Sequence, residues 1–227
     1  MNYARGNKKN KTNEHYYTKK PRSKLLNKEV TVNLFNINLR FITPSGVFCF
    51  GKVDSGSLLL IKKALIPKNA KVLDLGSGYG LIGITLAKVR DDVKIVMTDI
   101  NERAVTFCEK NVIINGLKNK LENGTIKIVQ GNLYEQFNNK PDDDSNNVAC
   151  NNKFDVILSN PPTHAGRKIC FKIIEEAKDY LNTDGVLEIV ARHSKGGKML
   201  MEKMQEVFGN VETLGKKGGF RVYMSRL

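Results

Sequence analysis

Two periodicities alternate along the chain. Short aliphatic runs typical of buried strands are separated by longer amphipathic stretches typical of helices. From residue 56 onward the pattern predicts helix 56–65, strand 71–75, helix 81–89, strand 93–98, helix 102–114, strand 125–130, strand 154–159, helix 168–181, strand 185–191, helix 198–208 and two closing strands around 216–219. Seven strands interleaved with helices predict an α/β fold, with a mostly parallel sheet covered on both faces and an antiparallel last strand.

The residues before this alternation predict an N-terminal β-hairpin. Residues 30–50 are rich in β-branched and aromatic residues and are interrupted at Thr43-Pro44-Ser45-Gly46, where we expect the turn. Residues 138–152 carry many Asn and Asp residues and predict a surface insertion. The expected organisation is a basic tail over 1–24, followed by one domain over 25–227.

Positive charge collects at both ends of the chain. The 227 residues have a formal net charge of +14. Residues 1–24 hold eight basic residues against one acid, and residues 192–227 hold eight against three. Two basic regions indicate a polyanionic partner, with nucleic acid as the first candidate. The tail has few aliphatic residues, so we expect its first dozen residues to be disordered in isolation.

The composition narrows the class of protein further. The longest aliphatic run, Leu58 to Ile61, is far below the roughly 18 residues of a membrane span. The N-terminus lacks the apolar segment of a secretory signal, so we expect a cytoplasmic protein without a membrane partner. The four cysteines, Cys49, Cys108, Cys150 and Cys170, lack metal-ligand spacing. They predict reduced thiols near the core and no metal site.

The sharpest local signal is the sequence Val72-Leu73-Asp74-Leu75-Gly76-Ser77-Gly78-Tyr79-Gly80, a buried strand that runs into three alternating glycines and then a helix. Such turns let backbone approach a ligand closely. The dinucleotide fingerprint needs its third glycine at position 81, which is Leu81, so a dehydrogenase fits poorly. Asp74 is placed to order the loop or to meet a cationic group of the ligand.

A second acid supports a nucleoside ligand. Asp99 follows the next strand, at the position where an acid in a nucleoside-binding α/β fold accepts hydrogen bonds from both ribose hydroxyls. Asp74, the glycine loop and Asp99 in consecutive elements therefore predict a nucleoside site.

A third motif, Ser159-Asn160-Pro161-Pro162, follows the fourth strand of the main alternation. An exocyclic amine on a base is a poor nucleophile because its lone pair is conjugated into the ring. The Asn160 side-chain oxygen and the Pro161 carbonyl can accept the two amine hydrogens and draw them out of the ring plane. We therefore predict that Asn160, Pro161 and Pro162 are catalytic residues for transfer to a planar amine.

Together these motifs resemble the class I S-adenosylmethionine-dependent methyltransferases, which have a Rossmann-like sheet. The resemblance implies S-adenosylmethionine as cofactor, S-adenosylhomocysteine as product and no metal. It implies that the loop packs on the methionine and ribose portions, that Asp99 holds the ribose, and that Ile100 and Asn132 contact the adenine. The implied cofactor-binding set is Asp74, Gly76, Ser77, Gly78, Gly80, Asp99, Ile100, Asn132, Leu133 and Asn160.

Enzymes with this motif that methylate adenine or glutamine usually have an aromatic residue after the prolines, where this chain has Thr163. Stacking on the target must then come from elsewhere, and the candidates are Phe48, Phe50, Tyr134 and His164. The predicted substrate-binding residues are Phe48, His164 and Arg167.

Two further stretches narrow the family. Gly46-Val47-Phe48-Cys49-Phe50-Gly51, followed by Asp54-Ser55-Gly56-Ser57, resembles the methyltransferase small domain of ribosomal RNA guanine-N2 methyltransferases. The C-terminal segment is similar to stand-alone archaeal versions of that domain. The expected activity is methylation of guanine N2 in small-subunit ribosomal RNA by a monomer or weak homo-oligomer. A protein glutamine methyltransferase and an inactive RNA-binding assembly factor are the alternatives.

Overall fold

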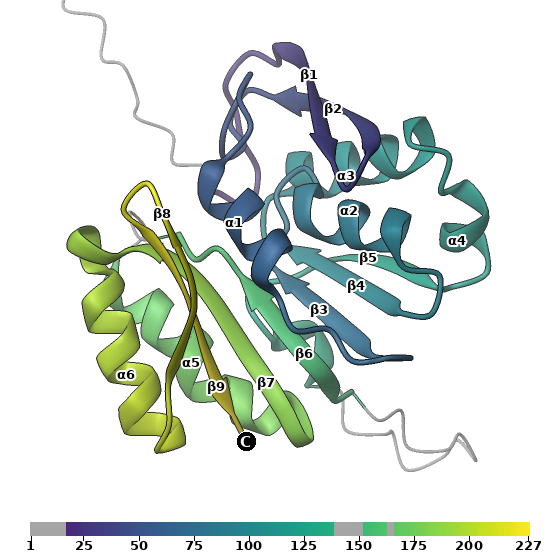
Figure 1. The fold of residues 1–227 in the computed structure, drawn as a ribbon. Helices are drawn as coiled ribbons and strands as arrows, with labels where there is room; N and C mark the ends of the chain where they lie inside the picture. The colour runs from purple at the N-terminus through teal and green to yellow at the C-terminus, as the bar shows by residue number, and fades with distance from the viewer. Residues whose placement is uncertain (1–16, 139–151, 163–165) are drawn as a thin grey trace, which may run out of the picture.

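A seven-stranded sheet forms the centre of the computed structural model, which describes residues 17–138, 152–162 and 166–227 (Figure 1). The strand order is β5-β4-β3-β6-β7-β9-β8. The strands are β3 Lys71–Leu75, β4 Lys94–Asp99, β5 Ile126–Gln130, β6 Phe154–Ser159, β7 Leu181–Arg192, β8 Glu212–Lys217 and β9 Phe220–Arg226. β3 to β7 are parallel, and β9 runs antiparallel to both β7 and β8. The predicted sheet with its antiparallel last strand is confirmed.

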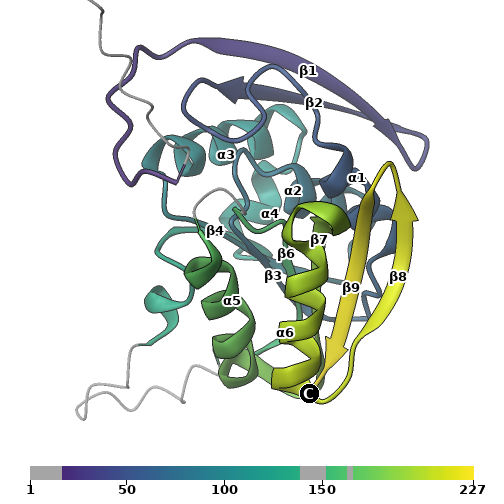
Figure 2. The same cartoon turned by 90° about the vertical axis from the view of Figure 1, so that its left-hand side faces the viewer.

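Helices cover both faces of the sheet (Figures 1 and 2). One face carries α1 Ser55–Lys63, α2 Leu81–Val89 and α3 Glu102–Ile114, and the other carries α5 Arg167–Tyr180 and α6 Lys198–Phe208. Successive strand residues such as Val72 and Leu73 belong to two separate core clusters, one on each face. Because both faces are buried, the central strands are hydrophobic at nearly every position.

Some shorter elements differ from the sequence prediction. The helix α4 Lys118–Glu122, the turn η1 Glu135–Phe137 and the π-helical turn η3 His193–Gly197 were not predicted. β7 starts at Leu181 rather than residue 185, because Leu181 already pairs with Phe154 before the register shifts around Asp184, whose φ is 63°. Cys108 and Cys170 are buried free thiols and Cys49 is half-buried, while Cys150 lies outside the described residues.

The N-terminal hairpin is present, but the expected position of its turn is wrong. β1 Asn27–Leu34 pairs with β2 Ile37–Pro44, and the chain reverses at Phe35 and Asn36, whose φ angles are 52° and 61°. Two residues at positive φ form the tight reversal that suits two twisted antiparallel strands. Pro44 instead ends β2, where a missing N–H leaves no internal ladder bond unmade.

Two asparagines on α3 hold the edge of this hairpin. Asn111 accepts from the Ile42 N–H at 2.8 Å and donates to the Ile42 carbonyl at 3.0 Å. One turn later, Asn115 makes the same pair of bonds with Arg40, at 3.1 and 2.7 Å. Side-chain amides thus replace a neighbouring strand along β2, which fixes the hairpin over α3.

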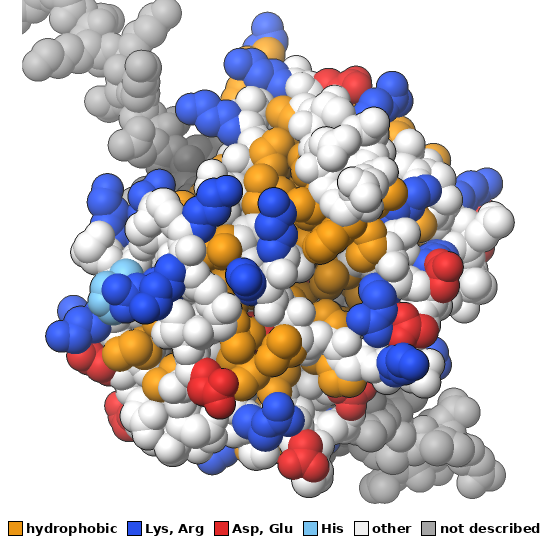
Figure 3. Space-filling model, in the orientation of Figure 1, with side chains coloured by type: hydrophobic (Ala, Val, Ile, Leu, Met, Phe, Trp, Pro, Cys, Tyr) orange, Lys and Arg blue, Asp and Glu red, His pale blue; other side chains and the backbone are white. Residues whose placement is uncertain are grey.

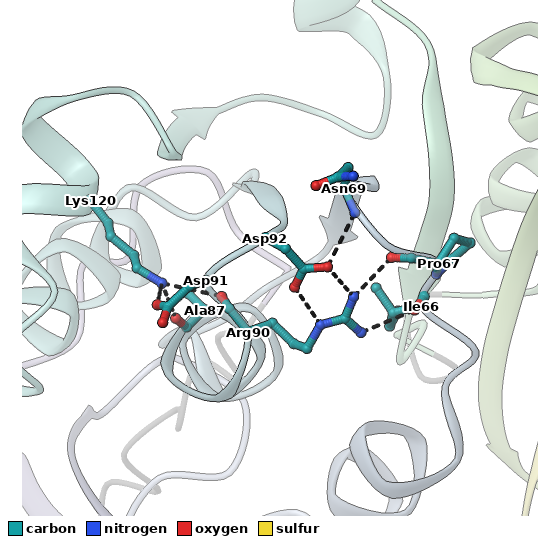
Figure 4. Close-up of polar contacts among 8 residues, drawn as sticks. All are labelled: Ile66, Pro67, Asn69, Ala87, Arg90, Asp91, Asp92 and Lys120. Atoms are coloured by element: carbon teal, nitrogen blue, oxygen red, sulfur yellow. Dashed lines mark hydrogen bonds and ion pairs between the residues drawn. The ribbon is translucent and has the colours of Figure 1, made fainter.

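A polar cluster lies just before the amino ends of β3 and β4 (Figure 4). The Arg90 guanidinium pairs with Asp92 at 2.6 Å and donates to the carbonyls of Ile66 and Pro67. This hydrogen bonding keeps the pKa of Asp92 well below its ordinary value. Beside it, Lys120 pairs with Asp91 at 2.7 Å. These contacts tie together the connections into β3 and β4.

Residues 17–24, part of the predicted basic tail, lie against the start of α3. The Glu102 N–H donates to the Lys19 carbonyl at 3.0 Å, and Arg103 donates to the carbonyls of Pro21 and Ser23. Residues 1–16, with most of the tail, and 139–151, with most of the predicted insertion, lie outside the described residues. No helix among the described residues is long and apolar enough to span a membrane.

Candidate active site

A cavity of about 460 Å³ lies at the carboxyl ends of β3, β4 and β6. The sheet order reverses between β3 and β6, and open α/β sheets bind their ligands at this kind of switch point. The lining includes most of the residues predicted from the sequence: Phe48, Gly76, Ser77, Gly78, Asp99, Ile100, Leu133, Asn160, Pro161 and Pro162. Segments far apart in the sequence therefore meet in one cavity.

The glycine loop forms one wall of this cavity with its backbone. Gly76 and Ser77 both donate their N–H groups to the Thr98 carbonyl at 2.9 Å, which ties the loop to the end of β4. Gly76 and Gly78 have φ angles of 78° and 57°, in the left-handed region that favours glycine. A Cβ at Gly76 would meet nothing within 4 Å, so the loop presents bare backbone to open space.

Asp74 and Gly80 were predicted to bind the cofactor, but neither lines the cavity. Asp74 is buried behind the loop, where its Oδ2 accepts from the Gly83 N–H of α2 at 2.9 Å. Burial raises the pKa of Asp74 to about 7. Gly80 begins α2, and a Cβ there would lie 2.6 Å from Ile84 Cδ1. Both residues hold the loop against α2 instead of lining its ligand side.

Asp99 places a carboxylate in the cavity floor. Its Oδ2 accepts from the Gly78 N–H at 2.9 Å, and its Oδ1 accepts from the Asn101 N–H at 2.8 Å. Each oxygen has two lone pairs, so each retains capacity for a ligand hydroxyl. Burial raises the pKa of Asp99 to about 6, against the opposing effect of these backbone hydrogen bonds. The carboxylate is therefore ionised at neutral pH.

Apolar side chains and an unpredicted tyrosine form the wall next to Asp99. Ile100 and Leu133 line the cavity, whereas Asn132 does not. The Oδ1 of Asn132 accepts from the Tyr17 hydroxyl at 2.9 Å. Tyr17 itself lines the cavity, and burial, assisted by the nearby Asp99, raises its pKa to about 12. A tyrosine from the N-terminal segment thus takes the wall position expected for Asn132.

The Asn160 amide is held in one orientation by two residues from α1 and its N-terminal cap. Its Nδ2 donates to Asp54 Oδ2 at 2.8 Å and to Ser57 Oγ at 3.0 Å. Asp54 is also the N-cap of α1 and accepts from the Ser57 N–H at 2.6 Å. Since an ionised carboxylate can only accept, the amide nitrogen must face it. The Asn160 Oδ1 is left as the acceptor on the other side of the amide.

The remaining predicted substrate residues separate into different environments. Phe48 lines the cavity and is 36% exposed. Tyr134 is fully buried, donating its hydroxyl to the Ile173 carbonyl, and the Phe50 ring carries Lys28 on its face. Arg167 is exposed at the start of α5 and does not line the cavity. His164 lies outside the described residues.

Three other lining residues were not singled out in the sequence. Phe220 starts β9, while Arg192 and Lys195 lie at and just after the end of β7. The Arg192 guanidinium lies 4.3 Å from the centre of the Phe220 ring. Arg192 and Lys195 belong to the basic region over residues 192–227, but no local sequence pattern links them to the glycine loop.

The donor set of the cavity fits S-adenosylmethionine. Bare loop backbone gives space for a chain to lie against it, Asp99 offers acceptors for ribose hydroxyls, and Ile100, Leu133 and Tyr17 offer apolar surface for a base. The carboxylates of Asp54 and Asp99 on the lining also suit a ligand that carries positive charge. In the part of the chain that the structure describes, no three His, Cys, Asp or Glu side chains cluster as metal ligands do.

Comparisons with known proteins agree with this architecture. The family model for the methyltransferase small domain matches residues 38–224. The uncharacterised protein YbxB of Bacillus subtilis is 36% identical over 214 residues, which are 94% of this chain and 98% of that protein. Ribosomal RNA small subunit methyltransferase C of Haemophilus influenzae is 33% identical over 190 residues, which are 82% of this chain and 51% of that protein.

Among solved structures, this chain resembles a 16S rRNA N2 methyltransferase from T. thermophilus, solved with AdoMet and guanosine. The TM-score is 0.68 at 23% identity, and the match covers 91% of this chain and 52% of that one. The chain thus spans about half the length of the ribosomal RNA methyltransferases it matches. By its sequence and its Rossmann-like fold, the chain belongs to the methyltransferase small domain family of S-adenosylmethionine-dependent methyltransferases.

Proposed function

We propose that this protein transfers a methyl group from S-adenosylmethionine to the N2 amine of a guanine in small-subunit ribosomal RNA. The observation that carries the proposal is the fixed Asn160 amide, whose nitrogen is held by Asp54 and Ser57. Its oxygen is left to accept a hydrogen bond, and it lies in the same cavity as the glycine loop and Asp99. An orientation of this kind suits a substrate that donates from an amine.

The proposed chemistry needs positioned acceptors and no strong base. The Asn160 Oδ1 and the Pro161 carbonyl accept the two amine hydrogens and draw them out of the ring plane, which reduces the conjugation of the nitrogen lone pair with the ring. The bound cofactor supplies an electrophilic methyl group on a sulfonium, and the product is S-adenosylhomocysteine. The amine becomes acidic only as it gains the methyl group, so its proton can then pass to water. Preorganised hydrogen-bond acceptors thus activate the amine without a general base.

The cofactor-binding roles follow from the cavity walls. In the proposal, Gly76, Ser77 and Gly78 lie against the methionine and ribose portions, and Asp99 accepts from the ribose hydroxyls. Ile100 and Leu133 flank the adenine, and Tyr17 covers it. In the proposal, the catalytic domain comprises residues 25–227, and residues 17–24 lie against the start of α3.

Charge supports RNA as the substrate class. Basic side chains gather on the side of the molecule where the tip of the β8–β9 hairpin and the start of α6 lie (Figure 3). Arg192 and Lys195 bring this charge to the cavity itself. A cationic rim attracts a phosphate backbone, and a base unstacked from an RNA loop could then enter the cavity.

The test is transfer of a labelled methyl group from S-adenosylmethionine to separate pools of ribosomal RNA, transfer RNA, DNA and protein. Labelled nucleic acid is digested to nucleosides and separated. Recovery of label as N2-methylguanosine from ribosomal RNA supports the proposal. Label in glutamine of a protein would move the assignment to a protein methyltransferase. No label in any of these pools, and none in intact small ribosomal subunits offered as a fifth substrate, would favour a binding module.

A further inference from the structure

The ring of Phe220 is fixed at the cavity wall by contacts from two other segments. Its Cε1 and Cδ1 atoms lie against Gly56 of α1, where a Cβ would come within 2.8 and 2.9 Å of them. Arg192 from β7 lies over the ring, with its guanidinium carbon 4.3 Å from the ring centre. The backbone beside the ring is anchored as well, because the His193 N–H donates to the Gly219 carbonyl at 3.0 Å. The aromatic ring is thus held in place before any substrate binds.

This ring lies where it can supply the aromatic side chain that the Asn160-Pro161-Pro162 motif lacks. The residue after Pro162 is Thr163, so the motif lacks the aromatic residue that could stack on a planar target. Phe220 lines the same cavity as Asn160, Pro161 and Pro162, although it lies far along the chain. Asp54 lies between Asn160 and Phe220. It accepts a hydrogen bond from Asn160, and its Oδ2 lies 3.0 Å from the position of a Cβ on Gly56. Phe220 packs on this same glycine.

We propose that Phe220, with Arg192 over its ring, is the stacking platform for the purine that enters the cavity. The inference rests on the proposed function, because it assigns the residue that holds the acceptor base of that reaction. Aromatic rings stack on any base, and a guanidinium over the ring adds a cation–π contact that keeps it in place.

The charges around the platform suit a nucleotide instead of a neutral planar compound. Lys195 also lines the cavity. Together with Arg192 over the ring, it places two cations beside the platform, where the phosphates flanking a flipped base would lie.

Two substitutions separate stacking from simple filling of space. Phe220→Leu keeps apolar bulk but removes the aromatic face, whereas Phe220→Tyr keeps the face. Stacking energies predict that Phe220→Leu lowers kcat/KM for the RNA by about 5- to 100-fold. Phe220→Tyr should stay within about threefold of the wild type, and both variants should bind S-adenosylhomocysteine normally. Full activity of Phe220→Leu, or equal losses in both variants, would overturn the platform.

A fluorescence experiment tests the platform without any turnover. The chain contains no tryptophan, so Phe220→Trp introduces a single tryptophan at the platform, which can be excited selectively over the tyrosines. Guanosine 5′-monophosphate is titrated into this variant after saturation with S-adenosylhomocysteine, and stacking should quench the emission. Phe208→Trp, on the distant end of α6, is the matched control and should not respond. Equal responses, or none, would reject the platform.

The two experiments distinguish failure of the platform from failure of the proposed reaction. Quenching at position 220 without methyl transfer to any RNA would keep the purine platform and reject the reaction. Transfer to guanine with full activity of Phe220→Leu would keep the reaction and reject the platform.

Discussion

The side chains of Asp54 and Asn160, 106 residues apart in the sequence, are joined by a 2.8 Å hydrogen bond from the amide nitrogen to the carboxylate. Ser57 also contacts this nitrogen, but a hydroxyl can donate or accept and would tolerate either orientation of the amide. Asp54 can only accept when ionised. The carboxylate of Asp54 therefore determines that the Asn160 oxygen, rather than its NH₂ group, is available to the substrate.

We expect Asp54→Ala to lower kcat by about 10- to 100-fold, as small displacements of a reacting group do. Without the carboxylate, only the Ser57 hydroxyl contacts the Asn160 amide nitrogen, and a hydroxyl accepts either orientation of the amide. Asp54→Asn should stay close to the wild type, because Oδ2 accepts from both the Ser57 N–H and Asn160, and an asparagine that caps α1 presents its amide oxygen to both. Steady-state kinetics with the methyl acceptor should show a change in kcat with little change in S-adenosylmethionine affinity. Ser57→Ala is the control, and a loss in it as large as that of Asp54→Ala would argue against the positioning role.

Asn160→Ala should remove most turnover and leave cofactor binding nearly intact. Loss of one preorganised group at a reacting centre typically costs about 100- to 1000-fold in kcat. Single-turnover transfer of labelled methyl measures the chemical step, and calorimetry with S-adenosylhomocysteine measures binding. Unchanged turnover would eliminate the proposed role of the amide.

Tyr17→Ala should weaken the binding of S-adenosylhomocysteine by about tenfold, because burying an aromatic side chain against a ligand is worth about 1.5–3 kcal/mol at most. Tyr17→Phe keeps the ring and loses only the bond to Asn132, so it should change affinity by about threefold or less. Calorimetric titration distinguishes the two. Phe35→Ala, at the exposed hairpin turn, serves as the control. Wild-type affinity in Tyr17→Ala would remove this residue from the cofactor site.

Glu188 makes the stability of the fold depend on pH. It is fully buried in β7, its Oε1 accepts from the Leu65 N–H at 2.8 Å, and its Oε2 has no hydrogen-bond partner among the described residues. Burial raises the pKa of Glu188 from 4.5 to about 7. The folded chain thus binds this proton more tightly than the unfolded chain does. The resulting stabilisation is complete below pH 4.5 and is lost as the pH rises through 7.

Glu188→Gln should therefore be more stable than the wild type at pH 8 and equally stable at pH 4. Each pKa unit corresponds to about 1.4 kcal/mol, so the free energy of unfolding should differ by up to about 3 kcal/mol at pH 8. Thermal melts across this pH range measure the difference in stability between the variant and the wild type as several degrees in Tm. Glu109→Gln, on the exposed side of α3, should show no such dependence. A Tm difference that stays constant with pH would contradict the raised pKa of Glu188.

Affinity for RNA should fall steeply with salt. Each lysine or arginine that contacts phosphate adds about one unit to the slope of log affinity against log salt concentration. Lys195→Ala and Lys216→Ala should each reduce the slope by about one unit, since Lys195 lines the cavity and Lys216 lies near the tip of the basic β8–β9 hairpin. Lys94→Ala, at the amino end of β4, should leave the slope unchanged. A flat salt profile in the wild type would argue against RNA as the substrate.

The sequence alone determined the order of the main elements, the glycine loop, Asp99 and the Asn160-Pro161-Pro162 motif. These are local signals, because hydrophobic periodicity reports burial and glycines or prolines report backbone conformation at their own positions. The same signals placed the hairpin turn wrongly, since Thr43-Pro44-Ser45-Gly46 has turn-forming residues while Phe35 and Asn36 carry the actual reversal. Turn propensity was overridden there by the pairing of β1 with β2 along their length.

Only the tertiary structure decided which side chains face the ligand space. Asp74 and Gly80 belong to the loop motif but face α2, and Asn132 is turned toward Tyr17 and Glu135. Conversely, Tyr17 lies in a segment without a motif, and Asp54 and Phe220 lie in stretches that indicated the family but not a place in the cavity. All three enter the site because the N-terminal segment, α1 and β9 converge on it. Side-chain direction depends on packing between segments distant in the chain. That information is absent from any single stretch of sequence.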